Sequence, residues 1–294
     1  MGDGRAPAGR APAGRTSADW TSPRGLRTDS LPWHLWEKAK RLMWNPADLD
    51  MAGDAAELAA LPTEARLIMA SLARGFMIGE EGVTLDILPL IQVMADEGRL
   101  EEVIYLTSFA FEEAKHVDFF CRWVDAAGMD FAELDEAVAA SYRRAGSEVP
   151  LQRDPIFEEE LPQVMRRLLT DRSAEAVLDA SVTYNQFVEG GLAIAGYRVW
   201  DQLFQRFDAL HGLQRGLTLV RRDESRHITY GTYLCRRLIA ADPGLLEVAT
   251  ARLRQLHRVF GGGSSGGRPG GAYGAGAAYR GARAGEDAGG GVAR

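Results

Sequence analysis

The chain has 294 residues, and its 46% hydrophobic and 26% charged content is typical of a globular protein. The net charge is −7, and both ends carry more arginine than acid, so the central body is more acidic than the whole chain. An acidic body argues against nucleic acid as a partner. Because no uninterrupted apolar run reaches about 18 residues, we expect no membrane-spanning helix.

The cysteine content is low, with only Cys121 and Cys235. Two cysteines in helical patterns do not indicate a disulfide framework, and we expect both to be small buried side chains. The first thirty residues contain no apolar segment of the kind found in secretory signals. A cytoplasmic location is therefore expected.

The chain divides into three parts by composition. Residues 1–30 contain the repeat Arg-Ala-Pro-Ala-Gly, which predicts a disordered extension. Residues 31–260 show apolar residues at helical spacing and no useful alternating pattern, which predicts one all-α domain. Residues 261–294 are rich in Gly, Ala and Arg, which predicts a disordered tail. This abrupt change suggests a reading-frame slip, which translation of the other frames beyond codon 260 would test.

Helices are expected in chain order within the central part, with Gly98 and Gly128 as helix stops. Glycines inside a helix cost stability and call for a local reason. We therefore expect a bulge or kink beside Glu80, among Gly75, Gly79 and Gly82. The expected helices cover residues 32–44, 62–97, 100–127, 131–144, 155–170, 173 to beyond 197, about 204–241, and 245–260.

Two Glu-x-x-His units dominate the central part: Glu113 with His116, and Glu224 with His227. Three helical positions correspond to roughly 300° of rotation, so the two side chains of each unit share one face. That face is otherwise apolar in both helices. A buried carboxylate and imidazole are costly unless something compensates them, and a metal ion compensates both.

A lone glutamate precedes each unit at nearly the same distance. Glu80 lies 33 residues before Glu113, and Glu189 lies 35 residues before Glu224. Helical bundles hold two metal ions with one Glu from each of two helices and one Glu-x-x-His from each of two others. A single unit would more often be a solvated or hydrogen-bonded pair, but the matched spacings predict a di-metal site. Carboxylate and imidazole ligands suit iron or manganese better than copper or structural zinc.

Neighbouring carboxylates leave some assignments open. The spacing of three selects Glu113 over Glu112 as the partner of His116. Asp223, directly before Glu224, is either a surface carboxylate or a group that orients a ligand histidine.

Four segments resemble the ligand-binding oxidases related to the ribonucleotide reductase small subunit. The resemblance covers about residues 31–260, implies a ferritin-like bundle and a homodimer, and favours Glu80 over Glu81 as the ligand. The segments are Glu80-Glu-Gly-Val-Thr, Phe111-Glu-Glu-Ala-Lys-His, Tyr184-Asn-Gln-Phe-Val-Glu-Gly and Arg222-Asp-Glu-Ser-Arg-His.

The same resemblance implies one manganese and one iron, with a di-iron pair as the alternative. Glu113 and Glu224 are the candidate bridging ligands. The manganese side would comprise Glu80, Glu113 and His116, and the iron side Glu189, Glu224 and His227.

The resemblance also implies the chemistry. Dioxygen activation would form an ether cross-link between the Tyr184 oxygen and the Val83 β-carbon, and a long-chain fatty acid or similar lipid-like ligand would bind in a hydrophobic channel. Val83 lies three residues after Glu80 and shares its side of the helix. Tyr184 lies five residues before Glu189, roughly 140° away on a regular helix, so a bulge would be needed. Ordinary core packing is the alternative for both residues.

Two other functions fit the same ligand set. A ribonucleotide reductase small subunit would generate a metal-based radical for a partner chain. The usual radical tyrosine of that family lies four residues after the first histidine ligand, where this chain has Phe120, although some small subunits also have phenylalanine there. A ferritin-like storage protein would need a cage and an iron-rich surface path, which the sequence does not indicate.

Overall fold

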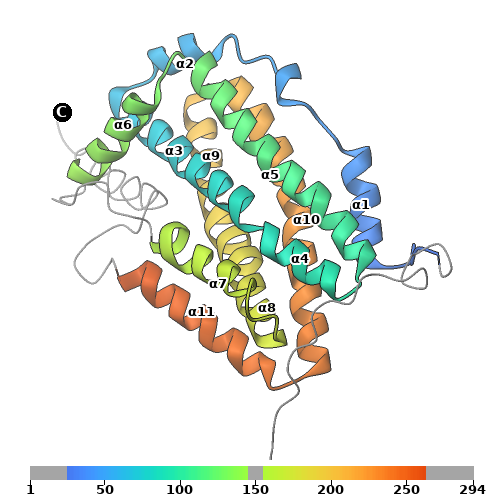
Figure 1. Cartoon of the computed structure of the whole chain (residues 1–294). Coiled ribbons are helices and arrows are strands. Elements are labelled where there is room, and N and C mark those ends of the chain that lie inside the picture. The colour runs from blue at the N-terminus through green and yellow to red at the C-terminus, as the bar shows by residue number, and fades with distance from the viewer. Residues whose placement is uncertain (1–24, 145–154, 263–294) are drawn as a thin grey trace, which may run out of the picture.

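The computed structural model describes residues 25–144 and 155–262, so most of the predicted extension and tail lies outside the described residues. Every regular element in these two ranges is helical, which confirms the all-α prediction (Figure 1). The elements are α1 (Leu31–Arg41), η2 (Pro46–Asp48), α2 (Asp54–Ala60), α3 (Thr63–Asp86), α4 (Leu88–Asp96), α5 (Leu100–Ala126), α6 (Phe131–Arg144), η3 (Ile156–Glu160), α7 (Leu161–Arg167), α8 (Ala174–Ser181), η4 (Val182–Ala193), α9 (Ile194–Phe207), α10 (His211–Ala241) and α11 (Leu245–Gly262).

Four long rods form the bundle: α3, α5, the continuous α8–η4–α9 helix, and α10 (Figure 1). Their apolar residues gather in two separate cores. The first core contains Val83, Phe109, Tyr184 and Tyr230, among others. The second core contains Phe76, Phe119, Tyr197 and Val220, among others.

The order of these residues shows how the rods run. On α3 and α10 the chain passes from the second core to the first, and on α5 and η4–α9 it passes from the first to the second. Neighbouring rods are therefore antiparallel. The polar residues between the two cores on all four rods meet in one layer.

Glycines end two helices at the predicted places. Gly98 and Gly128 both have φ of +69°, a conformation that costs glycine little. After them, Arg99 N bonds Met94 O at 3.0 Å and Met129 N bonds Val124 O at 3.1 Å, which closes each helix end. Both predicted stops are confirmed.

The prediction of a bulge beside Glu80 is wrong, because α3 is regular from Thr63 to Asp86. The helix breaks at Ile87, directly before α4. Pro89 lies in the first turn of α4, where its missing N–H and its ring prevent the preceding helix from continuing. A Cβ at Gly82 would lie 3.7 Å from the Phe157 ring, which is an ordinary van der Waals distance, so packing there does not require glycine.

The helix start expected near Phe204 is also wrong. The helix α9 continues to Phe207, and α10 begins at His211. Between them Asp208 and Leu210 have φ of +47° and +61°. Neither residue is a glycine, so the local sequence carries no strong signal for this turn.

A buried carboxylate from a distant segment stabilises the start of α10. Asp54, which is 1% exposed, accepts hydrogen bonds from Gly212 N and Leu213 N, both at 2.8 Å. It also accepts one from Trp123 Nε1 at 2.9 Å. An anion at a helix N-terminus satisfies free backbone N–H groups and interacts favourably with the helix dipole.

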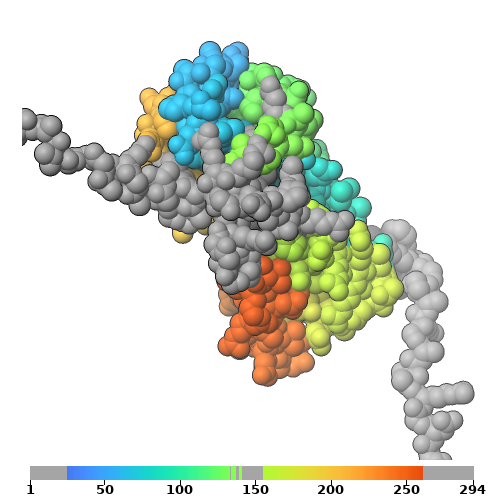
Figure 2. All heavy atoms as spheres, turned by 90° about the vertical axis from the view of Figure 1, so that its left-hand side faces the viewer, coloured from blue at the N-terminus to red at the C-terminus, as the bar shows by residue number. Residues whose placement is uncertain are grey.

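The last helix covers one side of the first core. In α11, Arg252 donates to Thr183 Oγ1 at 2.9 Å and pairs with Glu160 Oε2 at 2.7 Å. Figure 2 shows α11, in orange-red, beside the yellow-green residues that follow 155. In the described ranges, none of the helices is both long and apolar enough to cross a bilayer.

We expect Asp54→Ala to lower the free energy of unfolding by about 3 kcal/mol, because three buried N–H donors lose their acceptor. Urea unfolding followed by circular dichroism measures this. Asp48→Ala, which removes an exposed carboxylate nearby, is the control and should change stability by less than about 0.5 kcal/mol. Equal effects of the two substitutions would contradict the role of Asp54.

Candidate metal centre

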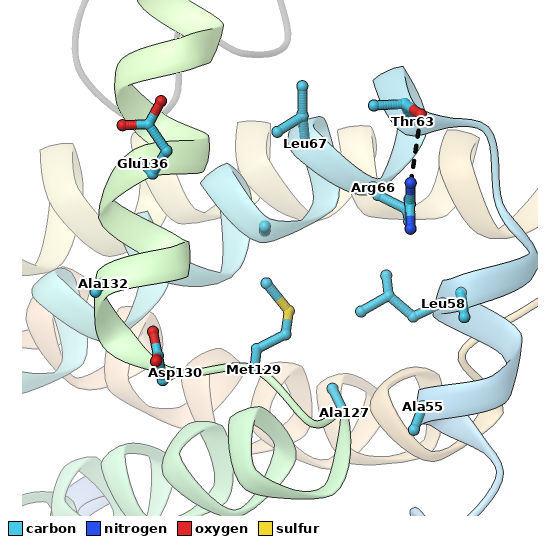
Figure 3. Close-up of a pocket in the computed structure, with 12 residues that line it drawn as sticks. Ala55, Leu58, Thr63, Arg66, Leu67, Ala127, Met129, Asp130, Ala132 and Glu136 are labelled. Atoms are coloured by element: carbon cyan, nitrogen blue, oxygen red, sulfur yellow. Dashed lines mark hydrogen bonds between the residues drawn. The ribbon is translucent and has the colours of Figure 1, made fainter.

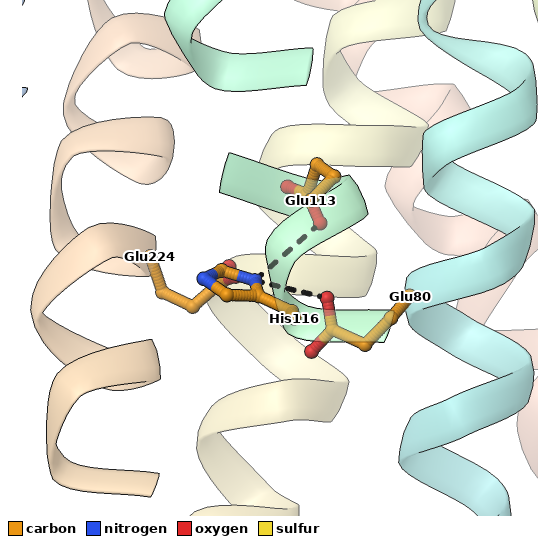
Figure 4. Close-up of side chains that lie close together, drawn as sticks. All are labelled: Glu80, Glu113, His116 and Glu224. Carbon is orange, nitrogen blue, oxygen red and sulfur yellow. Dashed lines mark hydrogen bonds and ion pairs between the residues drawn. The ribbon is translucent and has the colours of Figure 1, made fainter. Parts of the chain in front are cut away.

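Three rods bring Glu80, Glu113, His116 and Glu224 together in the polar layer (Figure 4). His116 Nδ1 lies 3.1 Å from Glu80 Oε2 and 3.3 Å from Glu224 Oε1. The same nitrogen lies 3.8 Å from Glu113 Oε2. All four side chains are buried.

A second group contains Glu113, Glu189, Glu224 and His227. His227 Nδ1 lies 3.0 Å from Glu113 Oε1 and 3.7 Å from Glu189 Oε1. In each group the candidate ligand atoms all lie within 4.8 Å of one another. Glu113 and Glu224 belong to both groups, which is the arrangement that two bridging carboxylates require.

The helix that carries Glu189 has an unusual winding. The segment η4, from Val182 to Ala193, is a π-helix. Hydrogen bonds between residues five apart bring side chains five apart onto one face, so Tyr184 and Glu189 point the same way. The bulge near Gly190 that the position of Tyr184 would need is present, and the π-helix extends over the whole segment. The Tyr184 hydroxyl donates to Glu113 Oε1 at 3.3 Å.

A neighbour in the same π-helix fixes one oxygen of Glu189. Asn185 Nδ2 donates to Glu189 Oε2 at 3.1 Å, and Asn185 Oδ1 accepts from Ser181. Gly231 on α10 makes room, since a Cβ there would lie 2.0 Å from the Asn185 Cβ. In the described part of the chain, Glu189 Oε1 has no hydrogen-bond partner. One oxygen is thus held and the other is free for a ligand.

Each histidine is oriented by the acid that directly precedes the other Glu-x-x-His unit. His116 Nε2 lies 3.4 Å from Asp223 Oδ2, and His227 Nε2 lies 2.9 Å from Glu112 Oε2. These contacts leave Nδ1 of both rings directed at the carboxylates of the layer. Of the two alternatives for Asp223, the structure supports the one that orients a histidine.

The sequence reasoning missed Glu112, although a signal was present. Both units read acid, Glu, small residue, base, His, beginning at Glu112 and at Asp223. The base of each unit also donates to the acid of the opposite unit. Lys115 donates to Asp223 Oδ2 at 2.7 Å, and Arg226 donates to Glu112 Oε1. Arg226 also donates to Asp223 Oδ1 at 2.7 Å.

The charges in this layer fit two divalent cations. Six buried carboxylates and two buried bases leave four negative charges, which two such ions balance. Among the described residues, Glu113 Oε2 and His227 Nδ1 also lack hydrogen-bond partners, as expected of ligand atoms. The carboxylates are Glu80, Glu112, Glu113, Glu189, Asp223 and Glu224, and the bases are Lys115 and Arg226.

The pKa values reflect this crowding. Burial raises the pKa of Glu80 and of Glu189 well above the usual range, and repulsion from Glu224 adds to both shifts. Burial alone would lower the pKa of the two histidines. The charge of Glu80 instead raises the pKa of His116, and that of Glu224 raises the pKa of His227, both well above the ordinary value.

A small cavity adjoins the carboxylates. It has a volume of ≈ 20 Å³, enough for one water-sized molecule. Val83 lines it together with the carboxylates, and the apolar walls come from Phe76, Phe157 and Val188, among others. A cavity of ≈ 610 Å³ is formed by residues from α2, α3, the α5–α6 turn and α6 (Figure 3). None of the candidate ligands lines that larger cavity.

Known proteins share this architecture. The family model described as "Ribonucleotide reductase, small chain" matches residues 28–256. The chain belongs to this family. A solved R2-like ligand-binding oxidase with an aerobically reconstituted Mn/Fe cofactor is 36% identical, with a TM-score of 0.73 over 82% of this chain and 80% of that one.

Two structures of one substituted form of R2-like ligand-binding oxidase are equally similar, each 36% identical with a TM-score of 0.73 over 82% of this chain. One carries an aerobically reconstituted Fe/Fe cofactor and the match covers 81% of it; the other carries a non-activated Mn/Mn cofactor and 84% is covered. The predicted ferritin-like fold is confirmed, and the chain is an oxidoreductase of the di-metal type.

For the metal-free chain we expect the free energy of unfolding to fall as pH rises from about 5 to about 8. Glu80, Glu189, His116 and His227 have raised folded-state pKa values, so the folded chain holds more protons than the unfolded chain across this range. Urea unfolding with a chelator present, at several pH values, measures the slope.

Glu189→Gln removes one of these groups and should flatten that slope, whereas Glu81→Gln, an exposed neighbour of Glu80, should leave it unchanged. Stability that rises across the range would refute the assignment of the shifts.

Proposed function

We propose that this chain is a dioxygen-activating oxidase that holds one manganese and one iron, with a di-iron pair as the alternative loading. The observation that carries the proposal is the pair of four-residue groups that share Glu113 and Glu224 in a charge-matched layer. The cofactors named for the similar solved oxidases support it. The proposed ligands are Glu80, Glu113, His116, Glu189, Glu224 and His227.

The two positions differ in their surroundings. On the proposed manganese side, Glu80 comes from the regular helix α3 and His116 is backed by Asp223 and Lys115. On the proposed iron side, Glu189 comes from the π-helix and His227 is backed by Glu112 and Arg226. Glu113 and Glu224 would bridge.

The proposed product is an ether bond between the Tyr184 oxygen and the Val83 β-carbon. Tyr184 is fully buried, and its hydroxyl donates to Glu113, which holds the phenolic oxygen beside the proposed centre. Val83 lines the small cavity beside Glu80 and Glu189, which has room for one water-sized molecule. Phe76 and Phe157 line the same cavity and limit the entry of water.

The electrons balance. Forming the ether removes one hydrogen from each residue, and with it two of the four electrons that reduce dioxygen to water. The bound metal ions in their reduced state would supply the other two.

A long-chain fatty acid or similar lipid-like molecule is the proposed further ligand. Its carboxylate matches the metal ions, and the apolar cavity walls match its chain. Because the cavity holds only ≈ 20 Å³, such a ligand requires side chains such as Phe157 to move. Phe157 is 7% exposed and lies in the short π-helix η3, close to the surface.

A radical-generating small subunit has weaker support. At the position of the usual radical tyrosine, Phe120 packs between Phe76 and Phe119, with ring centroids at 5.8 and 5.0 Å. A phenylalanine offers no hydroxyl for a tyrosyl radical, so a small subunit of this kind would have to keep its radical at the metal ions.

We also propose a homodimer in the cytoplasm. The exposed apolar side chains Leu85 and Leu88, at 66% and 60% exposure, offer an association surface. Cys121 and Cys235 are both free thiols, which suits a reducing compartment.

We expect Glu80→Gln to lower the metal content from two ions per chain toward one, because one position loses a charged ligand. Glu81→Gln is the matched control, since its side chain is exposed, and it should retain both ions. Elemental analysis after anaerobic loading with Mn(II) and Fe(II) gives the ratio. Two tightly held ions in Glu80→Gln would exclude this residue as a ligand.

We expect Tyr184→Phe to abolish the cross-link while metal binding persists, because the phenolic oxygen is the bonded atom. Peptide mass spectrometry after aerobic loading should show the Val83 and Tyr184 peptides joined, with two hydrogens lost, in the unsubstituted chain but not in Tyr184→Phe. Tyr230→Phe removes another buried hydroxyl, bonded to Glu102, and should leave the link intact. A link that survives in Tyr184→Phe would show that another residue supplies the oxygen.

A further inference from the structure

An oxidisable side chain connects the centre to the surface. Trp44 Nε1 donates to Asp223 Oδ2 at 2.7 Å, and the same oxygen lies 3.4 Å from His116 Nε2. The Trp44 and His116 rings lie nearly parallel, 19° apart, with centroids 6.4 Å apart. Trp44 is half-buried and lines a surface cavity of ≈ 640 Å³. This indole is therefore poised to lose an electron toward the centre.

A buried cation lies against that indole. The Lys115 side chain is 4% exposed, and its Nζ lies 4.5 Å from the centroid of the Trp44 ring. The same Nζ donates to Asp223 Oδ2 at 2.7 Å, so one ammonium touches both the indole and its hydrogen-bond acceptor. Burial of a lysine at such a place is costly and calls for a reason beyond packing.

We propose that Lys115 protects Trp44 from oxidation and so keeps the oxidising equivalents at the buried centre. A neutral indole attracts the ammonium through its electron-rich face. Loss of an electron makes the ring positive, and the attraction becomes repulsion between two like charges in a poorly solvated site. Lys115 also competes for Asp223 Oδ2, the atom that would take the indole proton.

This role rests on the proposed oxidase function, because that function supplies the oxidant. In the reaction that Lys115 suppresses, Trp44 gives one electron to the oxidised centre and its N–H proton to Asp223. The resulting indolyl radical would face the surface cavity, where dioxygen can add to it. Each electron that Trp44 gives to the centre consumes one of the two oxidising equivalents that joining Tyr184 to Val83 requires.

The fold should tolerate removal of the charge, because Asp223 keeps hydrogen bonds from Trp44 and Arg226. Lys115→Met retains the length of the side chain without its charge, and Lys115→Arg retains the charge. The full chain of each form is loaded with Mn(II) and Fe(II) and exposed to air. Mass spectrometry then gives the fraction of Trp44 that carries added oxygen and the yield of the Val83–Tyr184 link, and freeze-quench EPR detects a tryptophan radical.

We expect roughly tenfold more oxidised Trp44 in Lys115→Met than in the unsubstituted chain, with a lower cross-link yield. Lys115→Arg, which keeps the charge, should give less oxidised Trp44 than Lys115→Met, and the double substitution Lys115→Met with Trp44→Phe should raise the yield above that of Lys115→Met alone. Unchanged Trp44 oxidation in Lys115→Met with full metal content would overturn the proposal, as would a double variant in which the yield stays low.

A second experiment, on the metal-free chain, distinguishes failure of this inference from failure of the proposed function. A photoexcited ruthenium dye with a sacrificial acceptor oxidises Trp44 in the metal-free chain by one electron, and Lys115→Met should again give more oxidised Trp44 than Lys115→Arg. Equal oxidation of the two variants overturns the role of Lys115. Absence of the cross-link in the unsubstituted, metal-loaded chain instead overturns the proposed function alone.

Discussion

The structure depends on one costly layer, in which six carboxylates are buried between two apolar cores. Ionised groups removed from water must be paired, and Lys115 and Arg226 neutralise only part of this charge. The remaining charge matches two divalent ions, so the free energy of metal binding and that of folding are coupled. The raised pKa of Glu80 and of Glu189 shows what the metal-free layer does instead, which is to retain protons.

Antiparallel rods explain why the two halves of the site support each other. Because α5 and α10 run in opposite directions, their five-residue units face each other in reverse order. The acid that begins one unit then lies beside the histidine that ends the other, as Asp223 does for His116 and Glu112 does for His227. A change in either unit therefore disturbs ligands on both sides, and the site behaves as one element rather than two.

Much of the fold and of the candidate metal centre could be predicted from local spacing in the sequence. The Glu-x-x-His periodicity, the helix stops at Gly98 and Gly128 and the position of most helices depend on neighbours within a turn or two. The break at Asp208–Leu210 lacks a glycine or proline, and it is accompanied by the capping of α10 by Asp54 from a distant segment. The role of Glu112 likewise arises only when two rods meet. These features are tertiary, and no window of the sequence contains both partners.

The side chains around the layer differ in what an oxidant could take from them. Phe109 stacks on His227 with ring centroids at 3.6 Å, and a phenyl ring has no acidic hydrogen to lose on oxidation. Tyr105 packs against Phe109, and among the described residues its hydroxyl has no hydrogen-bond acceptor. Tyr184 has such an acceptor in Glu113, and Trp44 has one in Asp223, but only Trp44 has a lysine ammonium against its ring. The surroundings thus favour oxidation at Tyr184, the residue proposed to be joined to Val83, over loss of electrons toward the surface.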